Sequence, residues 1–229
     1  MPAAVSYVRH ALRSLLRHSA QPVSVLTASH PSPIVSSPQK FHGATLSSFT
    51  SISLHPHPLV AFAIRMPSRA ADSMRMHKTS NNTPHIVVNI LAASQAHTAV
   101  QFSRADLYPD PFSAVPYHLT DEGIPVLSGC IGAVSCALLA IWPSNIDYKG
   151  VEMDVGRTLE GTSELFIARV IRIESRAPSD SRQSNPEDME EGVPLPLIYH
   201  RQQYSTLQHR GKSGCDVARV IRGPSHRGC

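Results

Sequence analysis

Three segments of β-strand character follow one another in the first third of the chain, with no helical pattern between them. Val23–Thr27 alternates in polarity, residues 43–54 are rich in Ser and Thr, and Leu59–Ile64 is a continuous apolar run. Two prolines, Pro56 and Pro58, mark the turn before the third segment. A parallel sheet would need a helix between successive strands, so this order excludes a βαβ repeat.

The remaining pattern predicts a mainly β fold, a small barrel with helices at its edges. Helices are expected from Ser68 to about Lys78 and from Ser94 to about Arg104, each with its serine as N-cap and the first with Asp72 near its positive end. Residues 105–125 are Pro-rich and predicted to be mostly loop, as are residues 30–38. Further strands are predicted at His85–Leu91, at Val126–Trp142 with an internal turn, at Glu164–Ile173 and at Pro196–His200.

The two ends of the chain differ from its centre. Residues 1–19 form an amphipathic basic helix, in which Val8 and Leu12 belong to an apolar face and Arg9 and Arg13 to a basic one. This helix is either a mitochondrial presequence or, as we favour, a first helix packed on the domain. We place one domain at residues 20–207, a mobile acidic excursion within it at 174–192, and a disordered basic tail at 208–229.

Composition narrows the class of function. The net charge of +4 comes from scattered Lys and Arg, and aromatic residues make up 6%, so we expect no nucleic-acid partner. No run approaches the ~20 apolar residues of a membrane span. Four cysteines without C-x-x-C spacing indicate reduced thiols in an intracellular protein, cytoplasmic or mitochondrial. No metal site is expected, because the His55-Pro-His57 pair is better explained as surface histidines.

Groups that bind anions are more prominent than groups that catalyse. No G-x-S-x-G, P-loop or G-x-G-x-x-G occurs, and no catalytic residue is predicted. Thr45, Ser47 and Ser48 offer hydroxyls beside a turn, and at Ser68–Arg69 helix amides and a guanidinium can meet one phosphate. Asn89 is a lone amide on an apolar strand, either a satisfied core residue or a binding residue. This inventory suits a phosphorylated cofactor that performs its own chemistry.

The order of several short motifs resembles the flavin reductase-like, FMN-binding split-barrel family. These motifs are Gly43-x-Thr-x-Ser-Ser-Phe, Ser-x-Ser-Leu-x-Pro-x-Pro-Leu-Val60, Pro67-Ser-Arg69 and Val88-Asn-Ile-Leu-x3-Gln95. The resemblance covers roughly residues 20–207. The His between two prolines and the Pro-Ser-Arg helix start look like the fungal branch of the family.

The resemblance implies a Greek-key split β-barrel that forms a homodimer, with FMN near the subunit interface. Thr45, Leu46, Ser47 and Ser48 would lie against the isoalloxazine and ribityl chain, and Ser68 and Arg69 would hold the phosphate. Asn89 and Thr27 would belong to the same pocket. Relatives tend to have Thr after Ser-Arg; this chain has Ala70, so one phosphate hydroxyl is missing.

The implied activity is NAD(P)H-dependent reduction of flavin, with FMN or FAD receiving hydride. An oxygenase that consumes the reduced flavin would be the partner. Two alternatives remain open: an FMN-holding oxidoreductase of this fold with another substrate, and a non-catalytic flavin-binding protein.

Overall fold

The computed structural model describes residues 2–29, 41–76, 83–142, 163–174 and 194–207. The predicted loop at 30–38, the tail at 208–229 and all but the first residue of the acidic excursion at 174–192 lie outside these residues. The domain boundaries inferred from the sequence therefore stay predictions.

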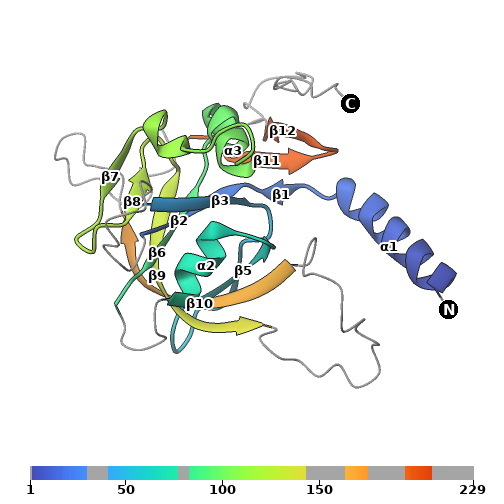
Figure 1. Ribbon diagram of the computed structural model, residues 1–229, viewed down its shortest axis with the longest axis horizontal. Coiled ribbons are helices and arrows are strands. Elements are labelled where there is room, and N and C mark those ends of the chain that lie inside the picture. Colours follow the sequence, from blue (N-terminus) through green and yellow to red (C-terminus); the bar gives the residue numbers. More distant parts are fainter. Residues whose placement is uncertain (1, 30–40, 77–82, 143–162, 175–193, 208–229) are drawn as a thin grey trace, which may run out of the picture.

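The main sheet has seven strands, and all neighbouring pairs are antiparallel. Its strands, in spatial order, are β3 (Phe41–Leu46), β2 (Ser24–Ser29), β6 (Ile86–Ile90), β9 (Gly132–Trp142), β10 (Ser163–Glu174), β5 (Leu59–Arg65) and β4 (Thr50–Ser53). Figure 1 shows this sheet curling around the centre of the molecule. The predicted fold class, a mainly β split barrel with edge helices, is confirmed.

Two smaller sheets and several short helices complete the described chain. One sheet pairs β1 (Gln21–Pro22), β11 (Leu197–His200) and β12 (Gln203–Thr206), and the other pairs β7 (Tyr117–Leu119) with β8 (Pro125–Leu127). The α-helices are α1 (Pro2–Arg17), α2 (Arg69–Met76) and α3 (Ala96–Ser103), and the 3-10 helices are η1 (Ala93–Gln95) and η2 (Pro111–Ser113).

A short crossing connects the two edge strands of the sheet. β3 and β4 are consecutive in sequence but lie at opposite edges of the sheet, so residues 47–49 pass from one edge to the other. The Ser48 hydroxyl takes part in this crossing, because it accepts a hydrogen bond from the Ala63 amide (2.8 Å) and donates one to the Ala63 carbonyl (3.1 Å). The single strand predicted from Gly43 to about Leu54 is therefore wrong: it is two strands.

The interior of the barrel is filled by apolar side chains from both halves of the sheet. Phe62 of β5 and Phe166 of β10 stack in parallel with ring centroids 5.6 Å apart, and both are fully buried. α2 covers this interior with Ala70, Ala71 and Met74. Full burial of one large apolar side chain contributes about 1.5–3 kcal/mol, so this cluster fixes the position of α2 against the sheet.

Two predicted features of the helices are wrong. Ser94 does not cap α3: it lies inside η1, and the Gln95 side chain accepts the Ala92 amide (3.0 Å) in a capping role instead. The helix at the N-terminus forms, but no described residue covers its apolar face: Val8 and Leu15 are 61% and 68% exposed, and α1 is joined to the β11–β12 turn at its end, where the Arg17 carbonyl accepts the Arg201 amide (2.9 Å). Figure 1 shows α1 projecting away from the barrel. A sequence pattern reveals an apolar face, but not whether another element covers it.

None of the helices in the described ranges combines the length and the apolar character that a membrane crossing requires.

Candidate functional site

A cavity of about 580 Å³ lies at the split of the barrel. One wall is β3, which contributes Phe41–Thr45, and a second is formed by the end of β5 and the start of α2, residues 64–70. The third wall is the end of α3 with the segment that follows it, to Phe112. The cavity therefore brings together three segments that are distant in sequence.

The β3 wall belongs to a sheet edge. In the described chain β2 is the only strand paired with β3, so β3 is an edge strand of the main sheet and its outer edge lies at the cavity. Gly43 allows α3 to approach this wall closely: a Cβ at this position would lie 2.6 Å from the Phe102 ring. The wall can offer backbone hydrogen bonds to the polar edge of a ligand.

The α2 wall carries the predicted phosphate-binding residues. Ser68 caps α2, as predicted: its Oγ accepts the Ala71 amide at 3.3 Å, and its carbonyl accepts the Asp72 amide at 3.0 Å. Arg69 is exposed at the cavity, and its guanidinium donates a hydrogen bond to the Pro109 carbonyl at 3.4 Å. The positive end of the α2 dipole and two arginines, Arg65 and Arg69, thus border the same space, which favours an anion.

Ala70, which stands where relatives tend to have Thr, is 1% exposed and packs in the barrel interior. It also lines the cavity. This side chain can supply apolar contact to a ligand but no hydroxyl.

The α3 wall is aromatic. The Phe102 ring meets Phe112 edge to face with centroids 5.0 Å apart, and Phe112 in turn lies 5.6 Å from Phe41. All three residues line the cavity. Such rings provide flat apolar surface for a planar ligand.

Gln101 also lines this wall, and the sequence analysis missed it. It is 6% exposed. Its place inside a short helical segment gives no signal that distinguishes it from any other glutamine.

The structure brings only part of the predicted binding set to the cavity. Thr45, Ser68 and Arg69 line it. Thr45 donates a hydrogen bond from Oγ1 to the Ala99 carbonyl of α3 (2.7 Å), which ties the β3 wall to the α3 wall. Leu46 is buried in the barrel interior, whereas Ser47 and Ser48 are exposed in the crossing segment just beyond it.

Thr27 and Asn89 lie elsewhere, in a closed network under β8. Both are fully buried. Asn89 Nδ2 donates to the Val25 carbonyl (3.1 Å) and to Thr27 Oγ1 (3.3 Å), and Asn89 Oδ1 accepts the Leu127 amide (2.9 Å). Thr27 Oγ1 donates to the Pro125 carbonyl (2.5 Å). These two side chains fasten β8 to β2 and β6, and neither lines the cavity.

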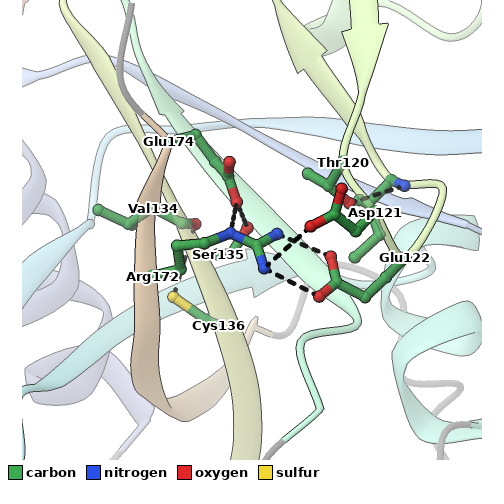
Figure 2. A network of polar contacts seen from close by, with 9 residues as sticks. Thr120, Asp121, Glu122, Val134, Ser135, Cys136, Arg172 and Glu174 are labelled. Carbon is green, nitrogen blue, oxygen red and sulfur yellow. Dashed lines mark hydrogen bonds and ion pairs between the residues drawn. The ribbon is translucent and has the colours of Figure 1, made fainter.

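A third polar region surrounds Arg172 of β10, as Figure 2 shows. Its guanidinium holds both oxygens of Glu122 (3.1 and 2.8 Å) and one oxygen of Glu174 (2.8 Å), which also accepts a hydrogen bond from Ser135. The hydrogen bonds from Arg172 lower the pKa of Glu122 to about 2, and the two carboxylates raise the pKa of Arg172. This network ties the turn between β7 and β8 to β9 and β10, away from the cavity-lining residues.

Comparison with known proteins places the fold and the cavity in context. The flavin reductase like domain family matches residues 16–208. The chain is 32% identical over 109 residues to a flavin reductase of Pseudomonas putida, covering 48% of this chain and 59% of that protein. It is 29% identical over 114 residues to the NADH-dependent FMN reductase SmoA of Agrobacterium fabrum, covering 50% of this chain and 56% of that protein. The matches thus span less than two thirds of either relative.

Among solved structures, nitrilotriacetate monooxygenase component B from Mycobacterium thermoresistibile shares the fold, with a TM-score of 0.60, 20% identity, and coverage of 94% of this chain and 98% of that one. Because the family match extends over most of the chain and includes every wall of the cavity, this protein belongs to the flavin reductase like domain family.

Proposed function

We propose that this protein is a flavin reductase that binds FMN in the cavity between β3, α2 and α3 and transfers hydride to it from NADH or NADPH. The observation that carries the proposal is the start of α2, where the capped N-terminus and the Arg69 guanidinium border a cavity with aromatic walls. A phosphate at one wall and a planar ring at another are the two parts of FMN that such a cavity would accept.

Ser68 and Arg69 would hold the phosphate. The Ser68 hydroxyl accepts the Ala71 amide with one of its two lone pairs, and its proton can be donated to a phosphate oxygen. The Arg69 guanidinium lines the cavity beside Ser68 and brings a positive charge and planar N–H donors, the geometry that suits a phosphate. Because Ala70 has no hydroxyl, binding of the phosphate would depend on these two side chains and on the dipole of α2.

The Thr45–Ser48 segment would serve the ring and the ribityl chain. Thr45 has its hydroxyl proton committed to Ala99, so it would offer an oxygen lone pair and its backbone groups. Leu46, Ser47 and Ser48 would contribute through the backbone near the crossing. We assign Thr27 and Asn89 to holding β8 rather than to the ligand, because their hydrogen bonds are already complete.

Bound flavin would supply the redox chemistry, accepting hydride from a nicotinamide that stacks on its ring. The chain would position the two rings and stabilise the negative charge that arrives on the flavin, for which the backbone donors at the edge of β3 are suited. Neither task needs a protein nucleophile, which agrees with the absence of a predicted catalytic residue.

The direct test is consumption of NADH and of NADPH with and without added FMN. We expect turnover that depends on FMN with at least one of the two nucleotides. No turnover with either nucleotide, despite FMN binding, would overturn the proposed function.

The phosphate site has its own test, the double variant Ser68→Ala, Arg69→Ala. Its Kd for FMN should rise about 30-fold or more, because two charge-assisted hydrogen bonds to the phosphate are lost. Its Kd for riboflavin, which lacks the phosphate, should stay unchanged. Arg104→Ala is the matched control, because Arg104 pairs with Asp106 and does not line the cavity. Equal weakening of FMN and riboflavin would place the phosphate elsewhere.

The wider setting of this activity is also proposed. The name of the Mycobacterium structure describes one component of a monooxygenase, and an oxygenase that consumes reduced flavin would be the corresponding partner here. We further propose a homodimer, testable by light scattering, and membership of the fungal branch, although the relatives compared above are bacterial.

We also propose that the protein is located in the cytoplasm or in mitochondria. Fusing residues 1–20 to a reporter and observing where the reporter goes would decide between the two.

A further inference from the structure

Two glutamines within one stretch of seven residues are almost equally buried but differ in their hydrogen bonds. Gln95 is 9% exposed, and its carboxamide is fully used: Oε1 accepts the Ala92 amide (3.0 Å) and Nε2 donates to the Ser128 carbonyl (2.9 Å). Gln101 is 6% exposed, yet its carboxamide makes no hydrogen bond with any residue the structure describes. Buried side-chain amides are normally paired, so Gln101 needs an explanation.

The cavity provides it. Within the described ranges, only the Ser24 hydroxyl is both sealed from solvent and unpartnered. The Gln101 amide is therefore not sealed, and the open space that Gln101 borders is the cavity between β3, α2 and α3. A polar group that borders such a space can hydrogen-bond to water there or to a ligand that displaces the water.

The neighbours of Gln101 indicate which part of a ligand it would meet. Phe102, Phe112 and Phe41 form the aromatic surface beside it, and the carboxamide itself is neutral. A carboxamide has a donor and an acceptor side by side, which matches the alternating C=O and N–H groups at the edge of a cyclic imide. Phosphate has no hydrogen to donate at neutral pH and finds better partners at Arg69.

We propose that Gln101 is a ligand-binding residue whose carboxamide pairs with the imide edge of the flavin ring and thereby selects the ring rather than the phosphate end of the ligand. The proposal rests on the proposed function, since it takes flavin as the ligand. It adds a ring-recognition residue on α3 to the phosphate-binding residues on α2.

The test uses Gln101→Met, which keeps the length of the side chain and removes its hydrogen-bonding groups. Binding of FMN and of riboflavin is measured by quenching of flavin fluorescence, and the melting temperature is measured on the ligand-free protein. We expect the Kd of both flavins to rise by the same factor, about tenfold, because the imide edge loses its partner in each case. The ligand-free melting temperature should stay the same or rise, since Gln101 has no hydrogen bond to lose.

Gln203→Met, at an exposed position on β12, is the matched control and should change neither Kd. Unchanged affinity of Gln101→Met for both flavins would overturn the inference while leaving the proposed function intact. A lower melting temperature with unchanged Kd values would do so as well, because it would make Gln101 a structural residue. If the wild-type protein binds neither flavin, the proposed function fails and the inference fails with it.

Discussion

The Thr27–Asn89 network and the cavity at the split of the barrel are both polar regions on the same sheet, but their hydrogen bonds are completed differently. In the network, the Asn89 carboxamide has partners on β2 and β8 within the chain. At the cavity, the Gln101 carboxamide has no hydrogen-bond partner among the residues that the structure describes. The first region is complete without a ligand and the second is not. Substitutions in the first should therefore change stability, and substitutions in the second should change binding.

The largest effect on stability is expected from Asn89→Leu. This change leaves the Leu127 amide without an acceptor in the interior, which we expect to lower the free energy of unfolding by about 3 kcal/mol. Urea denaturation monitored by fluorescence or circular dichroism would measure it. Thr50→Ala is the control, because the Thr50 hydroxyl is exposed and bonds only to the adjacent Ser51 carbonyl; its effect should stay within about 0.5 kcal/mol.

The same variant tests the comparison itself. The fraction of Asn89→Leu that stays folded should bind FMN with the Kd of the wild-type protein. Normal stability combined with weakened FMN binding would show that Asn89 belongs to the ligand site after all.

Gly43→Ala should have a smaller effect on stability but should act on both properties. The new Cβ would lie 2.6 Å from the Phe102 ring and 3.1 Å from the Leu26 carbonyl oxygen, and Phe102 is already packed against Phe112. We expect a loss of about 2 kcal/mol in the free energy of unfolding, typical of an overpacked core, and weaker FMN binding as β3 and α3 move apart. Urea denaturation and flavin titration would measure the two effects.

Gly132→Ala is the matched control, because a Cβ there would meet nothing within 4 Å. Combining Gly43→Ala with Phe102→Leu should recover part of the loss, since the contact that causes it is removed. An equal cost of Gly43→Ala in both backgrounds would rule out this contact as the cause.

The sequence predicted features that depend on neighbouring residues. The apolar run of β5 and the Ser68 cap of α2 were both predicted and are both present, because each depends on local periodicity or on a hydrogen bond across three residues. Ser94 failed as a cap because it lies inside the 3-10 helix η1, where Gln95 instead bonds the amide of Ala92, the residue that begins that turn.

Features that depend on distant partners could not be predicted in the same way. The sequence left two interpretations of Asn89, a core residue or a binding residue. The structure shows that its side chain accepts the amide of Leu127, 38 residues away. Gln101 and Gln95 look alike in sequence, and only the packing of α3 against the cavity and of η1 against Ser128 separates them. The proposed site therefore combines Ser68 and Arg69, which the sequence indicated, with Gln101, which required the structure.

The smallest effect on the free energy of unfolding is expected from Glu122→Gln in the Arg172 network. The hydrogen bonds of this network are completed within the chain, as in the Thr27–Asn89 network, but the network lies nearer to solvent. The Glu122 side chain is 21% exposed and that of Arg172 36%, so screening should limit the loss to about 1 kcal/mol at pH 7. Asp121→Asn is the control, because its carboxylate is 96% exposed and 3.9 Å from Arg172, and it should change nothing measurable.

The pH dependence of this variant follows from the direction of the pKa shift. Arg172 lowers the pKa of Glu122 from 4.5 to about 2, so the folded protein binds the proton less tightly than the unfolded chain does. The stability contributed by Glu122 is therefore complete above about pH 4.5 and is lost as the pH falls toward about 2. Urea denaturation at pH 7, 4 and 3 should show the difference between wild type and Glu122→Gln shrinking over that window. A difference that is the same at pH 3 as at pH 7 would mean that the side chain stabilises the turn by packing. In that case the charge of Glu122 would not contribute to stability. The smaller loss of stability in Glu122→Gln than in Asn89→Leu would then follow from the lower burial of the Arg172 network alone.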